Sequence, residues 1–242
     1  MINQLKKIYK KEQFAPKFIG LFINPFYFAR KGLNKNVVAL AKNLKGKLLD
    51  VGCGSKPYER ACNVDEYIGV EIENEANRDN PKVDFFYNGK SLPFEDKHFD
   101  SIITNQVFEH VFNPHAFLKE INRVTKIEGL MLMTVPFVWD EHEQPFDYAR
   151  YSSFGLKHIL SEEGFETVEQ RKSNNGITVI FQLLNAYIYK ITLTKYVFLN
   201  LLFTILLMAP INILGLIFSV ILPKNNDLYL DNIILAKKVK DV

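Results

Sequence analysis

The chain has 242 residues and 48% hydrophobic content, which is enough to bury the core of one domain with additions. Cys53 and Cys62 are its two cysteines, which excludes a disulfide-rich secreted scaffold and favours a reducing, cytoplasmic setting. The net charge of +3 conceals a basic N-terminal region, because residues 1–47 hold eleven Lys or Arg against one acid. That region predicts an anionic partner surface.

Residues 1–44 have the composition of helices that are interrupted at Pro16 and Pro25, where a helix interior would lose a hydrogen bond. Large apolar residues lie among the basic ones, which favours a lipid headgroup layer over nucleic acid as the partner. Two interpretations stay open, an amphipathic anchor in the membrane interface and a helical lid over the active site. The apolar patch lacks a small-residue cleavage site, so we expect no secretory signal peptide.

A short apolar strand over residues 47–51 precedes a glycine turn. Gly52 and Gly54 let the backbone approach a nucleotide without a Cβ clash, and Pro57 suits the first turn of a following helix. Pro57 also replaces the third glycine of the dinucleotide pattern, which disfavours an NAD-type site. The next predicted strand, over residues 67–71, ends in Glu71, where a carboxylate can accept hydrogen bonds from both hydroxyls of a ribose.

Together these segments resemble the class I S-adenosylmethionine-dependent methyltransferases, in particular their type 11-like members. The resemblance covers roughly residues 45–175 and 228–238. The motifs that carry it are the acid and glycine loop at 50–54, the acid Glu71 in preference to Glu73, Leu-Pro-Phe at 92–94 before Phe-Asp at 99–100, and Gly-Phe at 164–165.

The resemblance implies an α/β, Rossmann-like, doubly wound sheet of seven strands whose last strand, over 231–238, is antiparallel. An N-terminal helical arm precedes this sheet, and a hydrophobic helical insertion separates its sixth and seventh strands. We expect four segments: a basic, aromatic-rich arm or lid (1–45), the methyltransferase core (46–175), the insertion (176–224), and the final strand and tail (225–242). The other predicted elements are strands over 83–87, 99–105, 129–136 and 166–171, a helix over 113–124 capped by Asn113, and a helix from Ser152 or Ser153 to Leu160.

S-adenosylmethionine is the cofactor that the resemblance implies. Asn88 replaces an aspartate that is usual in the adenine-contacting loop, and its amide still offers a donor and an acceptor. Asn105 and Gln106 lie at the carboxyl end of a central strand, where ligands bind in open α/β sheets. The predicted cofactor-binding residues are Asp50, Gly52, Cys53, Gly54, Glu71, Ile72, Asn88, Gly89, Asn105 and Gln106.

A polar and aromatic loop over residues 137–151 leaves another carboxyl strand end, where an acceptor pocket would be built. His142 is the candidate general base for a hydroxyl, because its ordinary pKa lies near 6.5. Arg150 is suited to bind a carboxylate or phosphate of the acceptor, and the alternative is that it pairs with Asp140 or Asp147. The predicted acceptor-binding residues are Trp139, Glu141, Arg150 and Tyr151.

The pair Glu109-His110 has three interpretations. It is a structural pair, a part of the substrate pocket, or a metal ligand set like the Glu-x-x-Glu-His arrangement of some quinone-precursor methyltransferases. Gln106 stands where the first glutamate of that arrangement would be, so the structural interpretation ranks first and the metal last. We therefore expect no metal.

The insertion is apolar enough to interact with a membrane. Residues 196–223 contain no formal charge, but Pro210 and Asn212 interrupt them, so each half has the length of an interfacial or re-entrant helix. Both flanking strands belong to one sheet, which excludes a single crossing and leaves a re-entrant hairpin, a pair of crossings, or a homodimer interface through 177–222. Membrane association is favoured, because the basic arm supplies a second anchoring signal.

The sequence therefore predicts a methyltransferase for a small-molecule or lipid-linked acceptor that carries a sugar, with O-methylation at the inner face of a membrane and no nucleic acid partner. The loop over 137–151 resembles that of enzymes of bacterial cell-surface polysaccharide pathways. The alternatives are a methyltransferase of a prenylated quinone precursor and a non-catalytic membrane scaffold that keeps the nucleotide fold.

Overall fold

The computed structural model describes residues 2–75 and 77–242, and the chain forms two compact units. The core unit consists of Asn36–Arg171 and Asn232–Val242. The apolar unit consists of Met1–Lys35 and Lys172–Asp231. The chain therefore passes between the units three times, and the four predicted segments stay a prediction.

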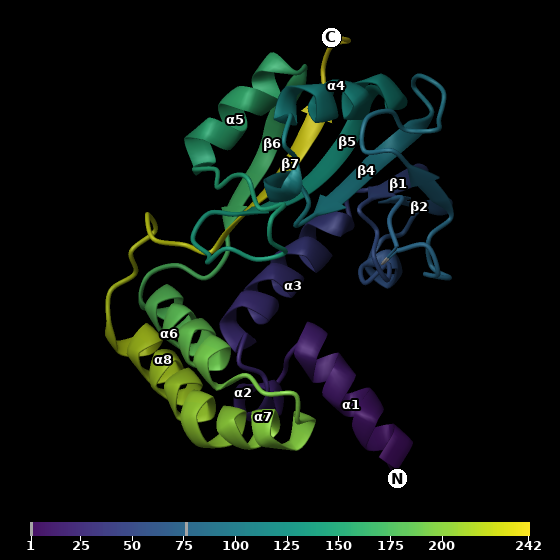
Figure 1. The fold of residues 1–242 in the computed structure, drawn as a ribbon. Helices are drawn as coiled ribbons and strands as arrows, with labels where there is room; N and C mark the ends of the chain where they lie inside the picture. Colours follow the sequence, from purple (N-terminus) through teal and green to yellow (C-terminus); the bar gives the residue numbers. More distant parts are fainter. Residues whose placement is uncertain (1, 76) are drawn as a thin grey trace. The chain divides into compact units, whose positions relative to one another are not determined.

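The core unit is built on a seven-stranded sheet with the order β3-β2-β1-β4-β5-β7-β6 (Figure 1). Strands β1 to β5 run parallel, and β7 is antiparallel to them. This is the predicted Rossmann-like fold. The strands are β1 (Lys47–Val51), β2 (Glu66–Ile72), β3 (Phe85–Tyr87), β4 (Phe99–Asn105), β5 (Thr125–Pro136), β6 (Phe165–Lys172) and β7 (Asp231–Lys238).

The register of the parallel strands aligns their carboxyl ends. Asp50 of β1 lies beside Gly69 of β2 and beside Ile103 of β4. Asn105, at the end of β4, lies beside Thr134 of β5. The polar residues that follow these strands therefore gather at one edge of the sheet, which is where open α/β sheets bind ligands.

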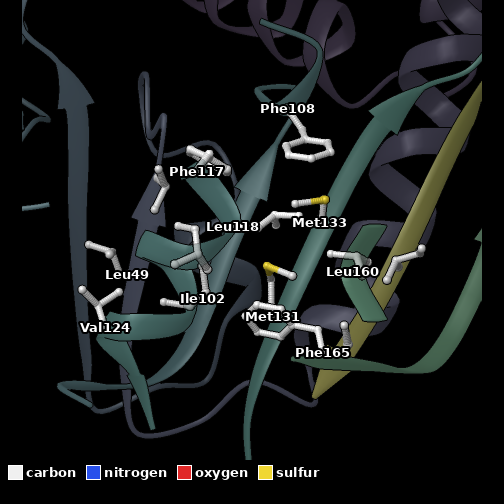
Figure 2. Close-up of a cluster of buried hydrophobic side chains, with 14 of the residues drawn as sticks. Leu49, Ile102, Phe108, Phe117, Leu118, Val124, Met131, Met133, Leu160 and Phe165 are labelled. Carbon is white, nitrogen blue, oxygen red and sulfur yellow. The ribbon is translucent and has the colours of Figure 1, made fainter. Parts of the chain in front are cut away.

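An apolar cluster packs the sheet against helices α4 (Pro114–Val124) and α5 (Ser153–Glu162). Figure 2 labels ten side chains of this cluster. The predicted caps are confirmed, because Asn113 accepts a hydrogen bond from the Ala116 N–H and Ser152 accepts one from the Gly155 N–H. Both helices turn their apolar residues toward the strands, as their spacing predicts.

Three boundaries differ from the prediction. A single 3₁₀ turn, η1 (Glu59–Ala61), stands where a helix from Pro57 was expected. Lys56 has a φ of +52°, which a right-handed helix does not adopt, and its ammonium group is paired with Asp84. Strand β3 is shorter than predicted, and β5 begins four residues before Gly129.

The apolar unit contains α1 (Ile2–Phe14), α2 (Gly20–Ile23), α6 (Ile177–Thr192), α7 (Val197–Phe203), the π-helical turn η3 (Thr204–Met208) and α8 (Ala209–Ile221). Helix α3 (Tyr27–Ala41) leads from this unit into the core unit. The predicted interruptions at Pro16 and Pro25 are confirmed, because each proline lies between two helices.

The predicted break at Pro210 and Asn212 is wrong, since the helix continues from Val197 to Ile221. The π turn explains the continuity. The Ala209 N–H donates to the Thr204 carbonyl, five residues back, so the helix is widened directly before the proline. A helix can absorb a proline where a local π adjustment relieves the clash with the preceding turn.

Candidate functional site

The glycine loop after β1 has a backbone that other residues rarely adopt. Gly52 has a φ of +74° and Gly54 a φ of +47°. A Cβ on Gly52 would lie 2.3 Å from Cγ2 of Val107, whereas a Cβ on Gly54 would enter open space. The loop therefore needs glycine at Gly52 for packing, and at Gly54 it leaves room for a ligand to approach the backbone.

Glu71 closes this loop from the end of β2. Its Oε2 accepts a hydrogen bond from the Gly54 N–H at 3.0 Å, and its Oε1 accepts one from the Ile72 N–H at 3.0 Å. Ile72 itself is exposed, and a Cβ on Gly89 would touch its Cδ1 atom at 3.0 Å. The structure thus brings together four predicted cofactor-binding residues at the ends of neighbouring strands. They are Gly54, Glu71, Ile72 and Gly89.

Asp50 is 4% exposed and accepts a hydrogen bond from the Tyr67 hydroxyl at 2.6 Å. Burial raises the pKa of Asp50 to about 7, the Tyr67 hydrogen bond opposes this, and the negative charge of Glu71 adds to it. Burial also raises the pKa of the Cys53 thiol to about 12, so this thiol is neutral at ordinary pH. Tyr67 was not predicted as a partner of Asp50. Its position on β2, the strand beside β1, could have indicated that contact.

The loop after β3 holds Asn88 and Gly89. The Asn88 side-chain oxygen accepts hydrogen bonds from the N–H groups of Lys90 and Ser91 at 2.9 and 3.1 Å. Gly89 has a φ of +76°, which fits this tight turn. The amide oxygen of Asn88 therefore shapes its own loop, and adenine contact by Asn88 stays a prediction.

Asn105 and Gln106 are organised by Thr134, a buried residue that the sequence analysis missed. The Thr134 hydroxyl donates to Oδ1 of Asn105 at 2.8 Å and accepts from the Gln106 side chain at 3.2 Å. Gln106 has a φ of +55°, an unfavourable conformation for a residue with a side chain. This turn directs Val107 onto Gly52, so it joins the end of β4 to the glycine loop.

The polar loop over 137–151 is organised by one ion pair. The Arg150 guanidinium binds both carboxylate oxygens of Asp147, at 2.5 and 2.6 Å. The Arg150 hydrogen bonds lower the pKa of Asp147 to about 2, against the effect of burial, and the His142 N–H contributes to the lowering. The pairing offered as the alternative for Arg150 is thus present, and acceptor binding by Arg150 stays a prediction.

The other predicted acceptor residues lie in the same loop. Tyr151 stacks on Phe108 with ring centroids 4.9 Å apart, so its ring also packs against the apolar core. Glu141 is exposed and accepts a hydrogen bond from the Gln144 side chain at 3.2 Å. Trp139 is half-buried.

His142 approaches Glu109 and His110, which belong to the 3₁₀ turn η2 (Phe108–His110) after β4. The Nε2 atoms of His110 and His142 lie 3.8 and 4.0 Å from Oε1 of Glu109. The two imidazole rings meet edge to face at 4.9 Å. Nothing in the sequence connects Glu109-His110 with His142, and the structure places all three in one cluster.

Comparison with known proteins identifies the class. The methyltransferase domain family matches residues 26–170, which is more than half of the chain, and the chain belongs to this family. The open Gly54 backbone, the carboxylate of Glu71 and the buried acid Asp50 fit S-adenosylmethionine, which contains an adenosine and a charged amino acid group. The protein is a class I S-adenosylmethionine-dependent methyltransferase.

Two uncharacterised proteins of Methanocaldococcus jannaschii are similar in sequence. One is 27% identical over an alignment of 149 residues that covers 55% of this chain and 71% of that protein. The other is 32% identical over an alignment of 97 residues that covers 38% of each chain.

Solved structures share the fold. A putative methyltransferase from Bacillus halodurans has a TM-score of 0.51 at 15% identity, over 86% of this chain and 98% of that one. Phosphoethanolamine N-methyltransferase 2 of Haemonchus contortus, in complex with S-adenosyl-L-methionine, has a TM-score of 0.52 at 13% identity, over 95% of this chain and 59% of that one.

Proposed function

We propose that this methyltransferase acts on a hydroxyl group of a lipid-linked, sugar-containing acceptor at the cytoplasmic face of a membrane. The observation that carries the proposal is the apolar unit, which exposes many large apolar side chains and buries several amide side chains. Water-soluble helices bury their apolar stripe. A segment with the opposite arrangement is suited to lipid.

Helix α6 has this inverted arrangement. Ile180, Leu184, Tyr187 and Ile191 recur at helical spacing, and all four are exposed. Gln182 and Asn185 lie on another stripe of the same helix and are fully buried. Burial of apolar area drives folding in water, so α6 gains from its exposed stripe only if something apolar covers it.

The helical stretch Val197–Ile221 follows the same rule. It has 25 residues with a mean hydropathy of 2.4 in its most apolar window, of which 28% is buried. Among the described residues it is the one helix long and apolar enough to span a membrane. Its exposed large apolar residues include Val197, Phe198, Leu199, Leu202, Ile205, Leu206, Leu207, Ile213, Leu214, Ile217, Phe218, Val220 and Ile221.

Amide side chains connect the interior of the apolar unit. Asn185 donates to Oδ1 of Asn212 at 2.8 Å, and Asn212 donates to the Leu21 and Asn24 carbonyls at 3.0 and 3.1 Å. The Gln182 side chain donates to the Pro25 carbonyl at 3.0 Å. Helices inside lipid lack a hydrophobic force between them and use such bonds to associate. The network therefore supports a membrane-embedded unit.

The charges of the apolar unit suit an anionic bilayer surface. The unit contains twelve Lys or Arg and three acids. Glu12 and Asp231 are buried, and Oε2 of Glu12 accepts hydrogen bonds from the Lys17 and Gly20 N–H groups. The outward charge is therefore strongly positive, which attracts the unit to anionic lipid headgroups.

The core unit supplies the chemistry. When bound, S-adenosylmethionine supplies an electrophilic methyl group on a sulfonium sulfur. We assign its binding to the residues around Gly54 and Glu71, and acceptor contacts to Trp139, Glu141, Arg150 and Tyr151. His142 takes the proton from the acceptor hydroxyl in the simplest mechanism, because Asp147 lies 3.2 Å from its Nδ1 and holds the ring.

Calorimetry with S-adenosylmethionine tests the cofactor site. We expect Glu71→Ala to weaken binding at least roughly 10-fold, because it removes the acceptor for the ribose hydroxyls. Glu73→Ala is the matched control, since Glu73 is exposed and lies 3.9 Å from Arg78. If wild type does not bind the cofactor and Glu71→Ala behaves identically, the chain is a non-catalytic scaffold.

Flotation with liposomes that contain anionic lipid tests the membrane. We expect wild type to float, and the double variant Leu206→Glu/Leu214→Glu to remain in the lower fractions, because two carboxylates oppose burial in lipid. The matched control is Phe112→Glu/Phe154→Glu, which changes two exposed phenylalanines of the core unit. A wild-type protein that stays in solution as a dimer, and becomes monomeric in Leu206→Glu/Leu214→Glu, would establish the homodimer interface instead.

Mass spectrometry identifies the acceptor. Purified protein with cofactor is incubated with lipid extracts and with nucleotide sugars, and products heavier by one methylene unit are sought. A methylated lipid-linked sugar supports the proposal. A methylated prenylated quinone precursor would favour the second candidate, which also has a membrane-embedded acceptor.

A further inference from the structure

We propose that Glu109, His110 and His142 bind a divalent transition-metal cation, and that this cation receives the acceptor hydroxyl. The second half of this statement rests on the proposed function, whereas the first half does not. The candidate site offers three ligand atoms, one carboxylate oxygen and two imidazole nitrogens. These atoms all lie within 4.8 Å of one another.

Hydrogen bonds fix the tautomer of His110. Its Nδ1 lies 2.9 Å from the Phe146 carbonyl oxygen. A carbonyl oxygen accepts hydrogen bonds only, so Nδ1 of His110 carries the hydrogen. In neutral His110 the lone pair is therefore on Nε2, the atom that faces Glu109.

His142 is fixed in the same way. Its Nδ1 lies 3.2 Å from Oδ2 of Asp147 and 3.3 Å from the Asp140 carbonyl, and both are acceptors. The lone pair of neutral His142 is thus also on Nε2 and directed to the cluster. Three atoms with lone pairs therefore face one another. They repel each other when the site is empty, and a cation between them would be attracted by all three.

The protein backbone holds the two halves of the cluster together. The Glu109 carbonyl accepts hydrogen bonds from the Tyr148 and Ala149 N–H groups at 2.9 and 3.2 Å. The side chain of Glu109 is fully buried. Asp147, which orients His142, is itself fixed by Arg150. Such outer contacts set ligand orientation in metal sites and raise the basicity of the histidines.

The donor set selects the kind of cation. Two imidazoles and one carboxylate suit Zn²⁺, Mn²⁺ or Fe²⁺ better than Mg²⁺ or Ca²⁺, which prefer oxygen ligands. Ligands about 2.1 Å from a tetrahedral Zn²⁺ lie about 3.4 Å apart. The Nε2 to Oε1 distances of 3.8 and 4.0 Å therefore need a contraction of about half an ångström, and the two imidazole nitrogens, which lie within 4.8 Å of each other, need one of at most about 1.4 Å.

Three protein ligands leave an open position on the cation, as in catalytic zinc sites. An acceptor hydroxyl in that position loses its proton to solvent more easily, because the cation stabilises the oxygen anion. That oxygen then forms the bond to the methyl carbon while the bond from carbon to sulfur breaks, and S-adenosylhomocysteine leaves as a neutral thioether. His142 is in this case a ligand, and the metal replaces it as the activating group.

Metal titration tests the site without any turnover. Protein freed of metal by chelation is titrated with Zn²⁺, Mn²⁺ and Mg²⁺ in a calorimeter, and we expect one equivalent of Zn²⁺ or Mn²⁺ and weaker Mg²⁺ binding. His110→Asn and His142→Asn should each weaken binding at least roughly 10-fold. His158→Asn is the matched control, because His158 forms a comparable pair with Glu162 at 3.5 Å on the surface.

Two outcomes would overturn the inference. One is that none of the three cations binds, and the other is that His142→Asn binds as tightly as His158→Asn. Circular dichroism of each variant checks the fold, and His110 and His142 are partly exposed, so their substitution is tolerated better than that of Glu109.

Binding of S-adenosylmethionine in the same samples separates this inference from the proposed function. If the cofactor binds and no cation does, only the metal site fails, and His142 keeps the role of base. If a cation binds and the cofactor does not, the proposed methyl transfer fails and the metal site stands.

Discussion

The core unit and the apolar unit place their polar and apolar side chains in opposite ways. In the core unit Leu49, Ile102 and Phe165 are buried between sheet and helices, while most of the charged residues are exposed. In the apolar unit Asn185 and Asn212 are buried, while residues such as Phe198 are exposed. One chain therefore contains one unit with an apolar core between sheet and helices and another that exposes a large apolar surface.

The difference shows that hydrophobic content alone does not identify a core. The informative observations are a buried polar network and an exposed apolar surface occurring in the same unit. Both units bury apolar side chains, and the apolar unit adds a buried network of amide hydrogen bonds. Substitutions of matched size should therefore have unequal effects on stability in the two units.

The largest effect is expected in the core unit. Phe165→Ala should lower the free energy of unfolding by about 3–5 kcal/mol, because Phe165 is 1% exposed and its removal leaves a cavity. Phe198→Ala removes the same atoms from a side chain that is 74% exposed and should change stability by less than about 0.5 kcal/mol. Denaturant unfolding in mild detergent measures both. Equal losses would contradict the comparison.

A buried acid provides the next largest effect. The pKa of Asp50 is about 7 in the folded chain, whereas the ordinary value of an unfolded chain is about 4. Between about pH 4 and pH 7 the folded chain therefore keeps a proton that the unfolded chain has lost. The free energy of unfolding consequently falls as pH rises through this range. Asp50→Asn removes this loss, which is at most about 4 kcal/mol. We expect the variant to be more stable than wild type at pH 8 and equal to it near pH 4.

Unfolding curves across this pH range provide the measurement for Asp50. Calorimetry should show that the same variant binds S-adenosylmethionine more weakly, so stability and cofactor affinity change in opposite directions. A difference in stability that does not depend on pH would contradict the assigned pKa.

The smallest effect concerns the polar interior of the apolar unit. Asn212→Leu increases hydrophobicity but leaves the Asn185 amide and two carbonyls without their bonds to Asn212, so we expect a loss of about 1–3 kcal/mol. Leu214→Asn, at an exposed position of the same helix, should cost less in detergent. Thermal loss of helical circular dichroism compares the two, and an Asn212→Leu variant that melts above wild type would refute the role of the network.

Much of the fold could be predicted, because local rules decide it. Apolar runs, caps and glycine turns located the strands and helices of the core unit, and the family resemblance supplied the seven-stranded sheet with its antiparallel last strand. The errors lie where a distant contact or a local adjustment of the backbone overrides these rules. Lys56 stays out of a helix because it pairs with Asp84, the residue before β3, and Pro210 remains in a helix because a π turn precedes it.

The candidate site was predictable only in part. A bound nucleoside needs a strand end where the backbone can come close and where a carboxylate can bind the ribose hydroxyls. These needs predict Gly52, Gly54 and Glu71. The partners that organise the site, Tyr67 and Thr134, were missed, because each becomes meaningful only through the register of neighbouring strands. The approach of His142 to Glu109 and His110 was missed because His142 lies 32 positions after His110, and no spacing rule connects them.

Strand β7 has a consequence for biosynthesis. It lies between β5 and β6, its residues Ile233 to Ala236 are buried, and it follows the whole apolar unit in the chain. A ribosome therefore releases residues 172–231 before the sheet can close. The helices over residues 177–221 are therefore synthesised, and can pack, while the sheet still lacks the strand that lies between β5 and β6.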